Sequence, residues 1–81
     1  MLTEGVMAFL DQAAKDARTQ LPDRNSSLFL SGVLDSFTLV DFVTLLEIEC
    51  NVKIGDADLR PANFDTIAKV EEFISRTRSA Q

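Results

Sequence analysis

The sequence predicts an all-α fold, a small four-helix bundle with three longer helices and one short third helix, in a single domain over residues 1–81. Apolar residues recur three and four positions apart in three separate stretches, which is the spacing of one helix face. The candidate strand Val52-Lys53-Ile54 is too short and is closed by Gly55. A chain of 81 residues has room for one modest core.

The first helix is expected from about Thr3 to Arg18, with Thr3 as its N-cap. We expect it to end before Leu21-Pro22, because a residue that precedes proline resists the α conformation. Its apolar residues at helical spacing are Val6, Phe9, Leu10, Ala13, Ala14 and Ala17.

A long connection follows, from roughly Gln20 to Asp35, and it is rich in turn formers such as Pro22-Asp23. Connections of this length are uncommon in compact domains and are either functional or held by their own apolar residues. We expect three residues to hold this one in place, namely Leu28, Phe29 and Leu34.

The second helix is expected from about Ser36 to Asn51, with Asp35 or Ser36 as its N-cap, and it has two apolar faces. One arc of the helical wheel forms the core face and carries Leu39, Phe42, Val43, Leu46 and Cys50. The rest of the helix carries apolar residues that the core does not need, among acidic ones: Phe37, Val40, Asp41, Thr44, Glu47 and Ile48. Several surplus apolar residues on one face indicate a docking surface with an acidic rim. The alternative is that the long connection folds over this side and buries Phe37 or Val40.

After the second helix, a short turn over Asp56–Arg60 is expected to stop at Pro61, and the last helix is expected to start after Asp65. This last helix carries Ile67, Val70, Phe73 and Ile74 on one stripe. The predicted core of the whole chain contains Val6, Phe9, Leu10, Leu28, Phe29, Leu39, Phe42, Val43, Leu46, Ile54, Leu59, Phe64, Ile67, Val70 and Ile74.

Composition argues against an enzyme. The chain has no His, Trp or Tyr and a single Cys, which removes the usual general base, the commonest metal ligand and any Cys–His pair. The net charge of −5 argues against nucleic acid as a partner, because binding there depends on Lys and Arg neutralising phosphates. The scattered acidic residues lack the clustering of a metal site. Cys50 lies on the core arc and is expected to be an inert buried thiol.

The compartment is expected to be the cytoplasm. One Cys cannot form an internal disulfide, and this suits a reducing environment. The N-terminus has neither a basic region nor a long apolar run, so no signal peptide is expected. No apolar stretch approaches the roughly 20 residues of a membrane span.

The segment Gly32-Val33-Leu34-Asp35-Ser36-Phe37 carries the clearest chemistry of the chain. It places the hydroxyl of Ser36 at the N-terminus of a helix, where unpaired N–H groups and the helix dipole favour an attached phosphate. Gly32 is expected to adopt a backbone conformation that other residues disfavour. Taken by itself, the Asp-Ser pair favours a plain N-cap serine over a modification site.

With its surroundings, this segment resembles the acyl and peptidyl carrier proteins over essentially the whole chain. LFLSGVLDSFTLVDFVTLLEIE is similar to the family's signature and its following helix, and DADLRPANFDTIAKVEEF is similar to the family's third and fourth helices. The resemblance rests on Asp35-Ser36 together with Phe29, Gly32 and the spacing to Asn63-Phe64 and Ile67.

The resemblance implies that Ser36 receives 4′-phosphopantetheine from coenzyme A and that Asp35 helps a phosphopantetheinyl transferase to engage. The prosthetic thiol would hold an acyl or aminoacyl group as a thioester, while the protein, acting as a monomer, does no chemistry itself. Further partners would be a loading enzyme (adenylating or acyltransferase) and a downstream synthase or transferase. A flexible arm on a compact acidic body gives the cargo a high effective concentration at each docked enzyme.

Two departures from the family pattern bear on the pathway. Phe37 and Thr38 stand where the family usually has leucine and an acidic residue, and Ile48 stands where fatty acid carriers are often acidic. These favour a polyketide, nonribosomal-peptide or aminoacyl-transfer system, with housekeeping fatty acid synthesis as the alternative. An alternative of another class is a small acidic helical interaction module that is not pantetheinylated.

Overall fold

The computed structural model describes residues 2–80, and over these it contains four α-helices, one short 3₁₀ turn and no strand. The helices are α1 (Glu4–Asp16), α2 (Ser36–Glu49), α3 (Pro61–Phe64) and α4 (Ile67–Ala80), and the 3₁₀ turn η1 covers Asp56–Asp58. The predicted all-α class, with three longer helices and a short third one, is confirmed. No helix among residues 2–80 has the length and apolar character required to cross a bilayer.

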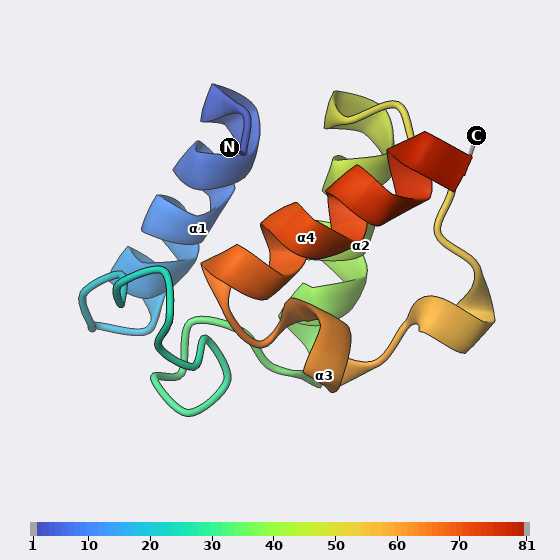
Figure 1. Ribbon diagram of the computed structural model, residues 1–81. Coiled ribbons are helices and arrows are strands. Elements are labelled where there is room, and N and C mark those ends of the chain that lie inside the picture. The colour runs from blue at the N-terminus through green and yellow to red at the C-terminus, as the bar shows by residue number, and fades with distance from the viewer. Residues whose placement is uncertain (1, 81) are drawn as a thin grey trace.

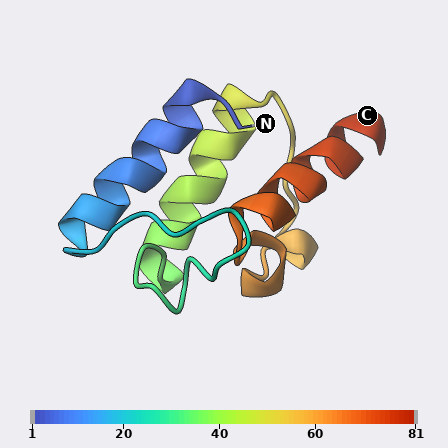
Figure 2. The ribbon, with the colours of Figure 1, turned by 60° about the vertical axis from the view of Figure 1, so that its left-hand side comes forward.

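The long helices surround the core with α2 in a central place. α1 and α2 pack side by side and run in opposite directions, and α2 lies between α1 and α4 in the second view (Figures 1 and 2). α3 packs against α4. The connection from α1 gathers at the end of the molecule where α2 begins, and α3 lies at that same end (Figure 1). The start of α2 therefore lies at the same end of the molecule as the connection and α3.

α1 begins as predicted but ends earlier. The Thr3 hydroxyl accepts a hydrogen bond from the Val6 amide at 3.2 Å, which confirms Thr3 as the N-cap. The helix stops at Asp16, because Arg18 turns into the left-handed region with a φ of 58°. The amides of Arg18 and Thr19 then bond to the carbonyls of Lys15 and Ala14, the pattern of a Schellman motif. This motif, and not the proline that follows, ends the helix.

The other boundaries need two smaller corrections. α2 ends at Glu49 and not at Asn51, because Asn51 adopts a left-handed φ of 53°, which asparagine tolerates. The predicted short turn over Asp56–Arg60 is present as η1 and ends at Asp58, and Pro61 then begins α3, a separate helix that was not predicted. Proline suits this position because the first helical amide has no partner within the helix. α4 starts after Asp65, as predicted, and the Thr66 hydroxyl accepts from the Lys69 amide at 3.0 Å.

Most of the predicted core residues are buried, and the α2 arc from Leu39 to Cys50 is buried throughout. Leu59 is the exception, with 36% of its surface exposed, because it follows the outlying turn η1. Phe9, Phe29 and Ile54 are only partly buried and pack against the core from its edge. The core also contains residues absent from the predicted list: Leu2, Ala14, Val33, Leu34, Cys50, Val52 and Phe73.

Candidate functional site

The start of α2 is fixed by Asp35, which adopts an extended conformation and caps the helix. Its Oδ1 accepts hydrogen bonds from the amides of Phe37 and Thr38, both at 2.9 Å. The Thr38 hydroxyl in turn accepts from the Asp35 amide at 2.7 Å, so that the two residues form a capping box. Hydrogen bonds from the backbone and the side chain of Thr38, and then from the Phe37 backbone, lower the pKa of Asp35.

Ser36 is the first residue of α2 and is exposed. Of the two predicted N-cap candidates, Asp35 is the N-cap in the structure, so the Ser36 hydroxyl does not cap the helix. Among the described residues this hydroxyl makes no hydrogen bond. The helix N-terminus adds a positive partial charge at this position. Ser36 thus presents an accessible hydroxyl where an attached phosphate is electrostatically favoured.

The loop over residues 28–34 leads into this site and is closed on itself. The Leu34 amide donates to the Leu28 carbonyl at 3.0 Å, while Leu28, Val33 and Leu34 are buried. Leu28 and Leu34 thus hold the connection as predicted, and Phe29 does so from a partly buried position. Gly32 has a φ of 86°, as its expected role requires, and no atom lies within 4 Å of the place where a Cβ would stand. The glycine is therefore needed for its backbone angle and not for space.

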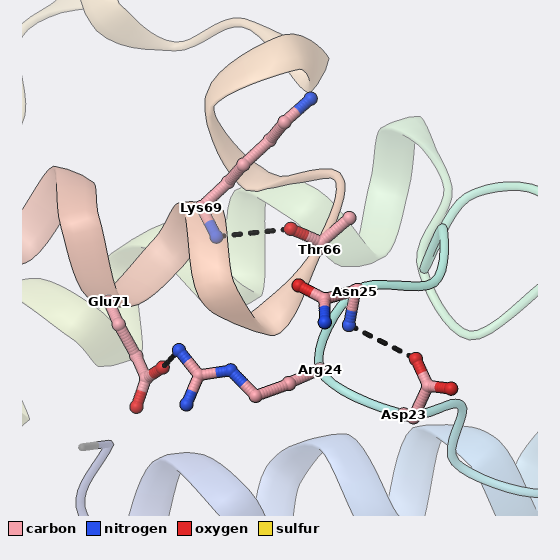
Figure 3. A network of polar contacts seen from close by, with 6 residues as sticks. All are labelled: Asp23, Arg24, Asn25, Thr66, Lys69 and Glu71. Atoms are coloured by element: carbon pink, nitrogen blue, oxygen red, sulfur yellow. Dashed lines mark hydrogen bonds and ion pairs between the residues drawn. The ribbon is translucent and has the colours of Figure 1, made fainter.

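Contacts with the start of α4 hold the same connection from the other side. Asp65 accepts from the Ser27 hydroxyl through its carboxylate and from the Leu28 amide through its carbonyl, both at 2.5 Å. The Ala68 amide donates to the Arg24 carbonyl at 2.9 Å. The Arg24 guanidinium pairs with Glu71 at 2.6 Å, as Figure 3 shows. Sequence reasoning missed these residues, since nothing in the local pattern links positions so far apart.

The outer face of α2 is open, as the surplus apolar residues indicated. Phe37 is 84% exposed, Ile48 is 72% exposed and Val40 is 53% exposed, so the connection does not bury Phe37 or Val40. Asp41 and Thr44 are exposed beside them, and the Thr44 hydroxyl bonds back to the Val40 carbonyl at 3.0 Å.

Glu47 differs from the other residues of this face. It is half-buried, and its Oε2 accepts from the Ile54 amide at 2.9 Å. Its carboxylate therefore also holds the segment that follows α2.

Cys50, at the end of the core arc of α2, is buried as expected. Burial raises the pKa of its thiol, which outweighs the opposite effect of the Arg78 charge. A thiol that stays protonated is a poor nucleophile, because the thiolate is the reactive species. Cys50 therefore offers no competing chemistry to the hydroxyl of Ser36.

Over residues 2–80, fold and site together define a small helical protein with an exposed serine at the start of a central helix. Over 57 residues the chain is 32% identical to the "Probable acyl carrier protein PigG" of Serratia sp.. The match covers 70% of this chain and 66% of that relative's own length. No family model matches the chain. The chain belongs to the acyl carrier protein family, whose members are carriers and not enzymes.

Proposed function

We propose that the chain carries an acyl or aminoacyl group as a thioester on 4′-phosphopantetheine attached to Ser36. The observation that carries this proposal is the capping box, in which Asp35 accepts from the amides of Phe37 and Thr38 and leaves the Ser36 hydroxyl exposed and without a hydrogen bond. When attached, the group supplies a terminal thiol for the cargo. The cytoplasm, where coenzyme A is available, is the compartment we propose.

Attachment requires one phosphoryl transfer, catalysed by a phosphopantetheinyl transferase. The Ser36 Oγ forms a bond to the phosphorus that bears the pantetheine in the diphosphate of coenzyme A. The bond from that phosphorus to the bridging oxygen breaks, adenosine 3′,5′-bisphosphate leaves, and the serine proton passes to a base of the transferase. The chain itself contributes an accessible nucleophile on a fixed backbone and a helix dipole that favours the resulting phosphate diester.

The outer face of α2 is the proposed docking surface for a loading enzyme and for a downstream synthase or transferase. Phe37, Val40 and Ile48 form its apolar centre, and Thr44 lies beside them. The exposed carboxylate of Asp41 supplies negative charge at the rim of this surface. Glu47 adds a second carboxylate there, although that carboxylate also accepts a hydrogen bond from the Ile54 amide. Phe37, Thr38 and Ile48 favour a polyketide, nonribosomal-peptide or aminoacyl-transfer system over fatty acid synthesis.

The test is the intact mass of the protein after incubation with coenzyme A and a phosphopantetheinyl transferase. We expect one pantetheine adduct, which Ser36→Ala abolishes and the matched control Ser75→Ala, at an exposed position on α4, leaves in place. Tandem mass spectrometry should place the adduct on Ser36. Absence of any adduct would favour a helical interaction module, and an adduct on another serine would show that the site is wrongly assigned.

A further inference from the structure

Leu30 is the most exposed large apolar side chain among the described residues, at 93%, although its backbone is held in place. Its amide donates to the Ser27 hydroxyl at 2.9 Å, and the Ser31 and Gly32 amides donate to the Ser27 and Phe29 carbonyls. The other apolar residues of the loop over residues 28–34 are buried or partly buried. The loop therefore directs one apolar residue outward from a fixed backbone.

Leu30 and Phe37 lie on either side of Ser36 along the chain, and both are exposed. The bond between Leu34 and Leu28 brings the base of the loop next to Asp35, and the loop lies at the end of the molecule where α2 begins (Figure 2). An enzyme that acts on the Ser36 Oγ must cover the surface around that atom. Phe37 follows Ser36 directly and falls within that surface, and the loop that carries Leu30 lies at the same end of the molecule.

The other side of the site is acidic. A cleft of about 360 Å³ opens between α1 and α2, with an apolar floor that includes Phe9, Ala13 and Val33. Asp16, Asp35 and Asp41 line this cleft, and no basic side chain does. A complementary partner surface would thus be apolar over the loop and positively charged over the cleft.

We propose that the enzyme that modifies Ser36 binds Leu30 and Phe37 in an apolar recess and places a basic side chain over the cleft at Asp16 and Asp41. This inference rests on the proposed function, and it adds the loop and α1 to a docking surface that otherwise consists of α2 alone. Apolar anchors near the centre of an interface contribute most of the affinity. Charges at the rim mainly set the rate of encounter and its dependence on salt.

The apolar part is tested by kcat/KM for pantetheinylation by a broad-specificity phosphopantetheinyl transferase with coenzyme A. Leu30→Gln and Phe37→Gln should each lower kcat/KM about tenfold, which corresponds to roughly 1.4 kcal/mol. Leu59→Gln is the matched control, because Leu59 is also an exposed leucine but follows η1, outside both the loop and α2. It should stay within about twofold of the native value. Circular dichroism verifies that each variant is folded.

The charged part is tested with Asp16→Asn against Asp11→Asn, an equal change of charge on α1 outside the cleft. Asp16→Asn should lower kcat/KM several-fold at low salt, with the difference lost at high salt because exposed charges are then screened. Native rates in the folded Leu30 and Phe37 variants, or equal effects of Asp16 and Asp11, would overturn the inference while Ser36 is still modified. Failure to modify the native chain would instead overturn the proposed function.

Discussion

Gly32 shows how a single residue fixes the approach to the modification site. Its φ of 86° lies in the region that side chains resist, while the space around it is open. Substitution therefore tests the backbone angle without a steric clash. Gly55 offers the opposite case, with open space and a φ of −79° that any residue adopts.

Gly32→Ala should lower the free energy of unfolding by about 1–2 kcal/mol, the usual cost of a left-handed conformation for a residue with a Cβ. In a domain of this size, that corresponds to a fall in melting temperature of roughly 4–16 °C. Gly55→Ala, as the control, should be neutral or stabilising by up to about 1 kcal/mol. Thermal melts measure both. Equal melting temperatures for the two variants would show that the positive φ of Gly32 does not affect stability.

The charge of Asp35 makes the start of α2 sensitive to pH. Hydrogen bonds to the carboxylate hold the pKa of Asp35 below its ordinary value of 3.8. The carboxylate therefore contributes stability that is present above pH 3.8 and is lost as the pH falls through the folded-state pKa. The stability gap between the native protein and Asp35→Asn should narrow as acid is added. Urea unfolding at pH 7 and below pH 3 measures it, and a constant gap would show that the carboxylate charge plays no part.

At the scale of elements, α2 packs one face into the core and exposes the other as the proposed docking surface. Substitution of Ile48 tests the exposed face. Ile48→Glu introduces the acidic residue often found in fatty acid carriers. It should lower the loading rate by the cognate loading enzyme about tenfold, because an exposed apolar anchor is replaced by a charge, and it should improve use by fatty acid synthesis enzymes. Loading rates are compared with those of Ile48→Ala, with circular dichroism as the folding control. Unchanged loading by folded Ile48 variants would remove the reason to favour a specialised pathway.

A comparison of the helices and loops with the sequence shows which of their features are locally encoded. The core arc of α2 and the starts of α1 and α4 were predictable, because apolar spacing and cap residues are local signals. The end of α1 was not, since Arg18 occupies a left-handed position that usually carries glycine. The exposure of Leu30 beside the buried Leu28 could not be predicted either, because a loop has no periodicity to separate its inner and outer residues.

On the scale of the whole molecule, stability depends on the packing between α1 and α2. Phe42 is fully buried, and its ring stacks on that of Phe9 with centroids 5.6 Å apart. Phe64 and Phe73 form a second aromatic pair between α3 and α4, with centroids 5.1 Å apart. One aromatic contact thus joins α1 to α2, and another joins α3 to α4.

Phe42→Ala should lower the free energy of unfolding by about 3–5 kcal/mol, and Leu46→Ala by about 2–5 kcal/mol, because both leave a cavity in the core. A small domain has a total of about 5 kcal/mol, so either variant should be partly unfolded. Val40→Ala on the exposed face of the same helix is the control and should change stability by less than about 0.5 kcal/mol. A shift of only one or two degrees in the Phe42→Ala melt would show that the core face is wrongly assigned.

The contact between Ser27 and Asp65 spans 38 positions of the chain, and this separation has a consequence for the order of events during synthesis. The connection before Ser36 acquires its partners on Asp65, Ala68 and Glu71 only after those residues have been made. At about 5–20 residues per second, translation reaches Glu71 roughly 2–7 s after Ser36. During that interval the serine has been made, but the segment that precedes it still lacks these partners. Recognition by the modifying enzyme through the loop would therefore select completed chains over growing ones.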